Sequence, residues 1–170
     1  MIIKDSLESP IAKGQRPKTR SAWIAILWAL AIFGSSCFFI SADAFIGFMQ
    51  RLLPNPSLQM AFARFWYHDG FFVVKAWHAT EYTILMSLLY LWLRRYMPPA
   101  RALFLALLVS IGYAATDEWH QTFVPKRDGC LRDVIIDSAG ASLMAAFCAI
   151  KLKRTNKAAT PSIAPDSLSA

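Results

Sequence analysis

Four long apolar stretches constrain the fold of this chain more strongly than any other feature of its sequence. They occupy about residues 22–40, 71–93, 101–117 and 134–151. A helix needs roughly 20 residues, at about 1.5 Å each, to cross the hydrocarbon of a bilayer. The first stretch is the cleanest, whereas the other three are short or contain ionisable residues and are expected to shelter one another. The sequence therefore predicts an all-α fold, a polytopic membrane helical bundle with about four transmembrane helices.

The composition argues against a typical soluble domain. Hydrophobic residues make up 56% of the chain and charged residues only 17%, whereas a soluble domain carries about 25% charged residues. The formal net charge is +7, but the basic residues lie at the edges of the apolar runs and form no basic stripe interleaved with aromatic residues. We therefore expect membrane lipids, and no nucleic acid, as partners.

The distribution of lysine and arginine predicts the orientation. Twelve of these residues fall in the segments on one side of a four-helix path, and five fall on the other side. Because basic residues accumulate on the cytoplasmic side, we expect a multi-pass protein of the plasma (inner) membrane with both termini in the cytoplasm. Residues 1–20 and 153–170 are expected to be flexible cytoplasmic segments that flank a transmembrane domain over residues 21–152.

The stretch between the first two spans has features of its own. Residues 42–44 (Ala-Asp-Ala) resemble a signal-peptidase site, although the preceding apolar run is longer than the about 7–15 residues of a signal peptide. The sequence AFIGFMQRLLP, residues 44–54, places four large apolar side chains on one helical face, as an interfacial helix does. Pro54 and Pro56 end that helix, and Ser57 is suited to cap a further short helix. We expect an interfacial or short helical segment here.

Three cysteines, Cys37, Cys130 and Cys148, fit no metal-binding spacing. We expect them to be packing residues. A Cys37–Cys130 disulfide is the alternative, because the predicted topology places both residues near the oxidising outer face.

Ionisable and polar side chains concentrate at the outer ends of the last three spans. Because the second span enters from outside, the third leaves toward it and the fourth re-enters, we expect these groups to form one layer. They are Lys75, His78, Glu81, Tyr82, Asp117, Glu118, His120, Gln121, Asp133 and Asp137. An isolated charge at mid-bilayer is unfavourable by about 2.5–3.5 kcal/mol on insertion scales, so inward pairing is expected. Pairing of Lys75 with Asp133 or Asp137 that only docks the helices is the alternative to a functional site.

The spacing of these residues indicates acid–base chemistry. His78 and Glu81 are three residues apart on one helix and can reach one point, with His78 as general base oriented by Glu81 or Asp117. Lys75 and Arg127 are then expected to hold an anionic group such as a lipid phosphate. On the third span, Glu118 points away from the face that carries Asp117. The cofactor is unknown; a divalent metal is an alternative, with His78, Glu81, Asp117 and His120 as candidate ligands.

These residues also resemble the VanZ-like family, which comprises integral membrane proteins similar to the teicoplanin-resistance protein. KAWHATEYTILMSLL is similar to the family's K-x-x-H-x-x-x-Y helix. ATDEWHQTFVPKRDGCLRDVIIDSAGA is similar to its D-E-x-x-Q-x-F-x-P-x-R-x-x-x-x-x-D-x-x-x-D-x-x-G segment. The similarity covers residues 71–150, with a weaker echo at Phe33-Gly34-Ser35-Ser36. A departure is Lys126, since members often have glycine before the arginine.

The resemblance and the residue chemistry together assign roles. Catalytic roles are predicted for His78, Glu81, Asp117 and Glu118. Substrate-binding roles are predicted for Lys75, Tyr82, Gln121, Arg127, Asp133 and Asp137. By resemblance, most of these side chains occupy the positions of the family's motifs.

What the resemblance implies about function is limited, because the family's namesake is associated with low-level teicoplanin resistance. We expect an extracytoplasmic site that acts on an envelope lipid or a lipid-linked cell-wall component, as a membrane-embedded hydrolase or transferase, with a lipid-linked or glycopeptide ligand. A non-catalytic binder of an amphiphile or lipid head group is one alternative, and a small transporter is another. The label phosphotransbutyrylase, carried by some members, does not fit, because its substrates are cytoplasmic.

Overall fold

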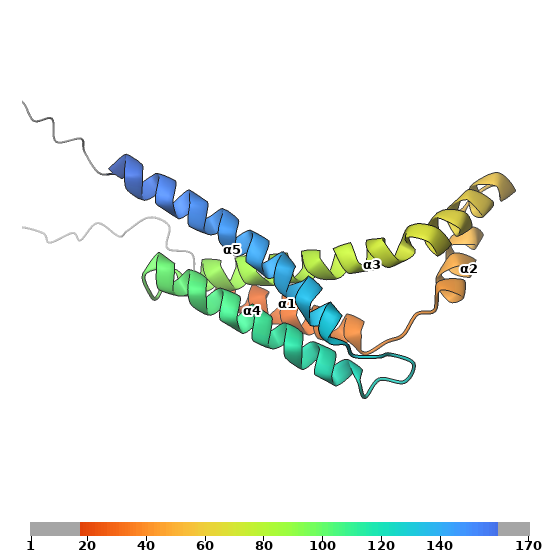
Figure 1. Ribbon diagram of the computed structural model, residues 1–170, viewed down its shortest axis with the longest axis horizontal. Helices are drawn as coiled ribbons and strands as arrows, with labels where there is room; N and C mark the ends of the chain where they lie inside the picture. Colours follow the sequence, from red (N-terminus) through yellow and green to blue (C-terminus); the bar gives the residue numbers. More distant parts are fainter. Residues whose placement is uncertain (1–17, 160–170) are drawn as a thin grey trace, which may run out of the picture.

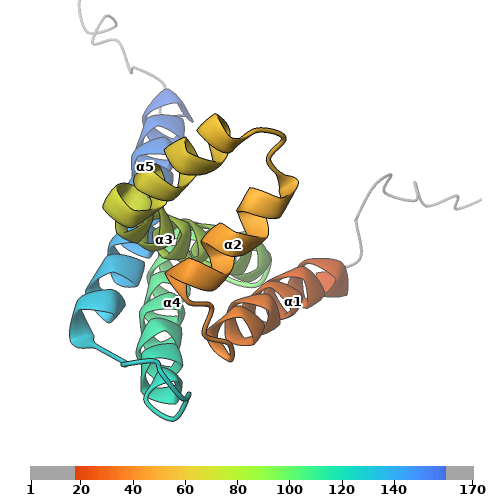
Figure 2. The same cartoon turned by 90° about the vertical axis from the view of Figure 1, so that its right-hand side faces the viewer.

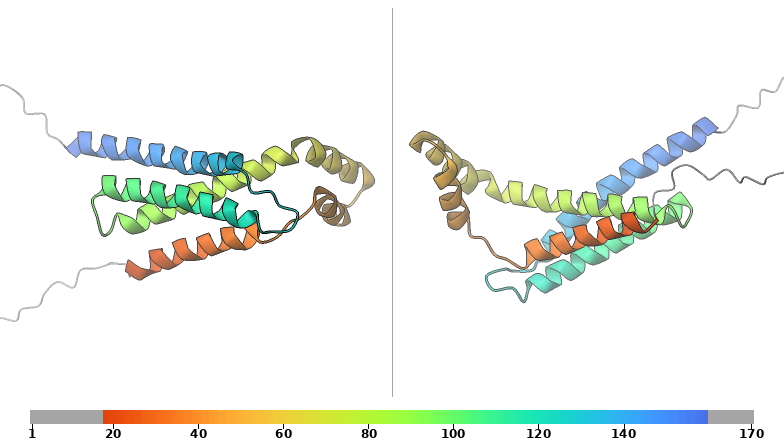
Figure 3. Two further views of the ribbon diagram at one scale, coloured as in Figure 1. Left: turned by 60° about the horizontal axis from the view of Figure 1, so that its bottom comes forward. Right: turned by 180° about the vertical axis from the view of Figure 1, so that it is seen from behind.

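The computed structural model describes residues 18–159, and these form helices and connecting loops without a β-strand. The helices are α1 (Lys18–Ser36), α2 (Ala42–Leu52), α3 (Pro56–Leu93), α4 (Pro99–Gln121) and α5 (Leu131–Ala159). Helices α1, α4, α5 and most of α3 lie side by side as a bundle, whereas α2 and the first turns of α3 extend beyond one end of it (Figure 1). The start of α1 and the end of α5 both lie at the opposite end of the bundle (Figure 3). The all-α prediction is confirmed.

Local signals explain where α2 and α3 begin. Ser41 caps α2, because its hydroxyl accepts a hydrogen bond from the Ala44 N–H at 3.2 Å. Asn55 caps α3, accepting from the Leu58 N–H at 2.8 Å, and proline follows at the first helical position, where its missing N–H costs nothing. The cap predicted at Ser57 is therefore wrong by two residues. Since no proline lies between Pro56 and Pro98, the short helix and the second span merge into one helix of 38 residues.

The apolar core fills the half of the bundle away from α2. It consists of larger side chains from α3 and small ones from α4 and α5, including Leu85, Met86, Leu89, Ala102, Ala106, Ala141 and Ala145. Small residues allow helices in a membrane to approach closely. At Gly140 the approach is at its limit, because a Cβ atom there would lie 2.1 Å from the Ala79 carbonyl oxygen of α3. The Thr83 hydroxyl reinforces this contact by donating to the Gly140 carbonyl at 2.9 Å.

The outer surface of the bundle is strongly apolar. Exposed large side chains include Trp23, Leu27, Leu30, Phe104, Leu108, Ile135, Leu143 and Phe147. Within the described chain, two helices are long and apolar enough to cross a membrane, Pro99–Gln121 and Leu131–Thr155, and Ser21–Ser36 forms a shorter apolar helix. The prediction of about four such helices is therefore too high by this measure. The apolar part of α1 is short, and the expected span in α3 carries Lys75, His78 and Glu81.

Two boundaries and one pairing differ from expectation. Helix α5 continues to Ala159 and α1 begins at Lys18, so parts of both segments expected to be flexible are helical. The rest of those segments, residues 1–17 and 160–170, lies outside the described residues. Cys37 and Cys130 are free thiols, so the disulfide considered as an alternative is absent from the described chain.

Candidate functional site

The polar residues gather at the end of the bundle that faces α2. Residues 75–82 of α3, the last turns of α4 and the first turns of α5 meet there, as the one-layer prediction requires. Viewed from this end, α2 and the first turns of α3 lie in front of the bundle (Figure 2). The contacts between α3 and α5 are the most extensive in the bundle, followed by those between α4 and α5.

A cavity of about 810 Å³ opens at this end. One wall is apolar and comes from the α1–α2 linker, α2 and α3, including Phe38, Phe39, Phe45, Trp66, Phe71 and Val74. The rest of the lining is mainly polar and includes Lys75, His78, Gln121, Lys126, Arg127, Asp128 and Asp133. The cavity is therefore amphipathic, with charged and aromatic side chains in one lining, and the Lys75 Nζ lies 5.6 Å from the centre of the Phe71 ring.

Lys75 and Asp133 form an ion pair between α3 and α5. The Lys75 Nζ lies 2.5 Å from Oδ2 of Asp133, and both side chains are largely buried. Arg132 contacts the other oxygen of Asp133 at 3.4 Å. Of the two partners that the sequence left open for Lys75, the structure brings Asp133 to it.

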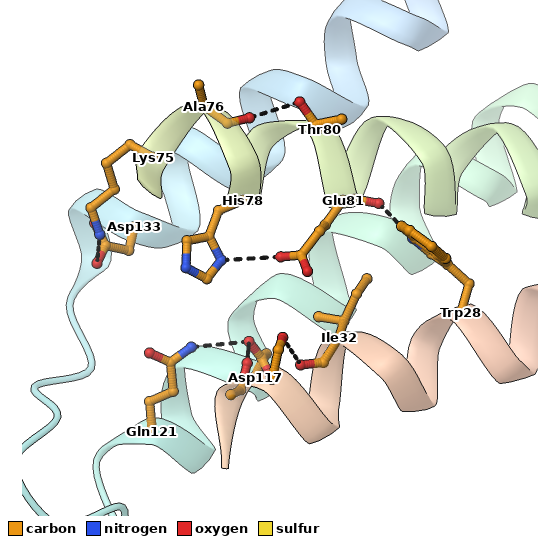
Figure 4. A network of polar contacts seen from close by, with 12 residues as sticks. Trp28, Ile32, Lys75, Ala76, His78, Thr80, Glu81, Asp117, Gln121 and Asp133 are labelled. Carbon is orange, nitrogen blue, oxygen red and sulfur yellow. Dashed lines mark hydrogen bonds and ion pairs between the residues drawn. The ribbon is translucent and has the colours of Figure 1, made fainter. Parts of the chain in front are cut away.

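His78 and Glu81 connect the cavity to the interior of the bundle. His78 lines the cavity, and its Nδ1 lies 3.4 Å from Oε2 of the buried Glu81 (Figure 4). Neither atom has a hydrogen-bond partner within residues 18–159, so this is a close contact without hydrogen-bond geometry. Trp28 of α1 donates from Nε1 to the Glu81 backbone carbonyl at 2.9 Å and docks α1 at this turn.

Asp117 is the centre of a buried network between α1 and α4. Its Oδ2 accepts from the Ser36 hydroxyl at 2.7 Å and from the Gln121 side-chain amide at 3.0 Å (Figure 4 shows the Gln121 bond). Ser36 is fully buried and was not among the predicted site residues. Its signal in the sequence is a pair of serines, Ser35-Ser36, at the end of an otherwise apolar run.

Glu118 holds the loop between α4 and α5. It is buried, and its Oε2 accepts from the Cys130 backbone N–H at 3.1 Å. The loop also packs closely on α4, because a Cβ atom at Gly129 would lie 2.2 Å from the Glu118 carbonyl oxygen. Glu118 does point away from the Asp117 face, yet it is buried against the loop, and these contacts indicate a positioning role.

Among the site residues predicted from the sequence, Tyr82 and Asp137 are the most deeply buried. Tyr82 is 0% exposed and Asp137 is 1% exposed. The Tyr82 hydroxyl and both Asp137 oxygens lack a hydrogen-bond partner in the part of the chain that the structure describes. A buried polar group without a partner is unfavourable by about 1–3 kcal/mol, so these groups are maintained at the expense of stability.

The predicted site residues thus divide into two layers. Lys75, His78, Gln121, Arg127 and Asp133 line the cavity. Glu81, Tyr82, Asp117, Glu118 and Asp137 are buried behind it. The sequence predicted their convergence but did not distinguish the layers.

The metal-ligand set proposed from the sequence does not assemble. His78 and Glu81 are in contact, but the His120 ring packs on Phe33 of α1 at 4.6 Å between centroids. Across residues 18–159, no group of three or more histidine, cysteine, aspartate or glutamate side chains is arranged to hold a metal ion. The residues present do not fit the divalent metal that was the alternative.

Taken together, the helical bundle, its apolar surface and the two span-length helices indicate a membrane protein with a polar site at one end. The chain belongs to the VanZ/LLP1 family, whose sequence pattern matches residues 21–152, most of its length. This confirms the resemblance seen in the two motifs. Comparisons with curated proteins and with solved structures find no match.

Proposed function

We propose that this VanZ/LLP1-family protein binds an amphiphile of the bacterial cell envelope, a lipid or lipid-linked cell-wall component, and acts on it at the cavity beside His78. The observation that carries the proposal is the amphipathic cavity, whose lining combines aromatic side chains with lysine, arginine and histidine. Ligand cavities combine apolar walls with a few convergent polar groups. An amphiphile matches both parts of the lining at once.

The proposed arrangement in the membrane has about four spans with both termini in the cytoplasm. The lysine and arginine distribution supports this orientation, and it makes the cavity extracytoplasmic. In this arrangement α1 crosses the membrane although its apolar part is short. The second half of α3 also crosses it, because α3 directs its charged residues into the bundle. The amphipathic α2 and the first turns of α3 then lie at the outer interface, where Trp66 and Tyr67 suit the head-group region.

The proposed chemistry is general acid–base catalysis of hydrolysis or transfer. His78 is the acid or base that reaches the ligand, and Glu81 is the positioning carboxylate at 3.4 Å behind it. A base oriented by a second buried group is a recurring feature of such sites. The link to teicoplanin-type resistance follows from the family and would reflect an altered envelope component.

A non-catalytic binder is the second candidate function. It is favoured by the contact between His78 and Glu81, which lacks hydrogen-bond geometry although the site is assembled. A small transporter is less well supported, because α3 carries no charged residue after Glu81 and its core beyond that point includes Leu85, Met86 and Leu89.

His78→Ala and the matched control His68→Ala test the catalytic proposal. His68 is an exposed histidine on the same helix, with its side chain 85% exposed. In a bacterial host that expresses the full chain, we expect His78→Ala to abolish the gain in teicoplanin tolerance and His68→Ala to preserve it, at equal membrane levels. Full tolerance in His78→Ala would reject catalysis by His78. Tolerance that survives in His78→Gln as well as in His78→Ala would favour the binder.

A further inference from the structure

The loop between α4 and α5 adopts a conformation that is unusual for its sequence. Lys126 has a φ of 66°, and among residues 18–159 it is the only non-glycine residue with a positive φ. Side chains with a Cβ atom rarely adopt this left-handed region. Strained residues of this kind persist where the surrounding structure holds them, and they cluster at functional sites.

The surrounding structure does hold this loop. The Arg127 N–H donates to the Val124 carbonyl at 3.1 Å, which closes the turn around Lys126. Glu118 accepts from the Cys130 N–H at 3.1 Å, and Gly129 packs on the α4 backbone. The chain that follows the turn is therefore anchored on α4, and both Lys126 and Arg127 line the cavity. Lys126 also lines an adjoining cavity of about 420 Å³.

The charges on the cavity wall are unequally matched. Lys75 forms an ion pair with Asp133, with 2.5 Å between Nζ and Oδ2. Within residues 18–159, Lys126 and Arg127 form no ion pair with any carboxylate. With Asp128 as the remaining carboxylate on the wall, the loop presents two cations against one anion. Its cations are free to meet an anionic ligand, whereas Lys75 is already paired.

We propose that Lys126 and Arg127 recognise a phosphate-bearing anionic head group, and that Lys75 serves to dock α3 onto α5. The proposal rests on the proposed function only in that an amphiphile occupies the cavity. The apolar chain of the ligand lies against the aromatic wall that includes Phe38 and Phe71. The planar guanidinium of Arg127 suits a phosphate, because it donates two parallel hydrogen bonds. The left-handed turn places Lys126 in the same cavity lining as Arg127, so that two cations meet one anionic group.

Lipid binding to the purified full chain in a non-ionic detergent tests this assignment. Native mass spectrometry would compare phosphatidylglycerol, which is anionic, with phosphatidylcholine of the same acyl chains, which shares the phosphodiester but has no net charge. We expect phosphatidylglycerol to bind about tenfold more tightly, the size of one charge-assisted hydrogen bond. Arg127→Gln should remove this preference, and Lys126→Gly should reduce it while raising thermal stability by relieving the left-handed lysine.

The controls separate the cavity from the rest of the basic surface. Arg51→Gln, an exposed cation of α2, should leave the preference intact, as should Lys75→Met combined with Asp133→Leu. An undiminished preference in Arg127→Gln would overturn the assignment, as would its loss in the Lys75/Asp133 double variant. Inorganic phosphate should not displace the lipid; displacement would mean that a free phosphate, not a lipid, is the ligand.

The same experiment distinguishes failure of this assignment from failure of the proposed function. If the unaltered chain retains neither lipid, no amphiphile occupies the cavity and the proposed function fails. If it retains both lipids equally in every variant, the amphiphile site stands and only the role of the loop cations is wrong.

Discussion

The two ends of the bundle are built from the same helices, yet they satisfy their buried groups very differently. At the end away from α2, side chains such as Leu85, Met86 and Ala106 are packed with little or no exposure. At the end that faces α2, Asp137 and Tyr82 are as deeply buried but have polar atoms without partners in the described chain. Burial stabilises the first end and is unfavourable at the second. The comparison teaches that the same degree of burial has opposite consequences for stability at the two ends, because it covers apolar side chains at one end and polar atoms without partners at the other.

The largest effect is expected at the boundary between the two ends, from Gly140→Ala. The new methyl group would lie 2.1 Å from the Ala79 carbonyl oxygen, so α3 and α5 would have to separate. We expect the free energy of unfolding to fall by about 3 kcal/mol, the upper end of the usual range for overpacking. Thermal unfolding in detergent at a fixed scan rate would measure the change.

Gly112→Ala is the matched control, because a Cβ atom at that helical glycine meets no atom of the described chain within 4 Å. It should be neutral or stabilising by up to about 1 kcal/mol, since alanine favours a helix over glycine. Equal losses in the free energy of unfolding of the two variants would show that the close contact between α3 and α5 at Gly140 is not important for stability.

A smaller effect is expected from Asp133→Asn at the polar end. The change leaves the partly buried Lys75 ammonium without its carboxylate, and we expect a loss of about 1–2 kcal/mol, below the 3–5 kcal/mol known for fully buried pairs. Lys75→Met combined with Asp133→Leu should restore the thermal midpoint to near that of the unaltered chain. A double variant less stable than Asp133→Asn would mean that the ion pair itself stabilises the fold, which would contradict the division between the ends.

The smallest effect on stability is expected from Asp137→Asn. Its carboxylate oxygens have no hydrogen-bond partner in residues 18–159, so a neutral amide of the same size should leave the free energy of unfolding unchanged or raise it by less than about 1 kcal/mol. Teicoplanin tolerance in the expressing host should nevertheless be lost. A large loss of stability with tolerance retained would reverse the comparison and make Asp137 a structural residue.

Some features of the site were predictable because they depend on spacing along one helix. The contact between His78 and Glu81 follows from a separation of three residues, which places both side chains on neighbouring positions of a helix. Pairing of Lys75 with an aspartate near the start of α5 was predicted, with Asp133 and Asp137 both left open, and the structure pairs it with Asp133. A helix over residues 44–54 was predicted from its apolar face, and the structure confirms it as α2, shifted to Ala42–Leu52.

Other features depend on residues distant in the sequence and were missed. Ser36 and Asp117 are 81 positions apart, and their hydrogen bond exists because α1 packs beside α4. The cap of α3 was expected at Ser57, since the sequence did not reveal that the Asn55 side chain would reach the free N–H groups first. The left-handed turn at Lys126 is imposed by contacts of the loop with α4, which no local preference of lysine anticipates.

By itself, the sequence determined the helical class, the end of the bundle at which the charged residues meet and the family, because apolar runs, helical spacing and motif residues are properties of short segments. Only the tertiary structure decided which of those residues line the cavity and which are buried behind it. Helical periodicity gives the direction of a side chain but not its depth. Depth depends on how closely neighbouring helices approach, and in this protein that distance is set by small residues such as Gly140.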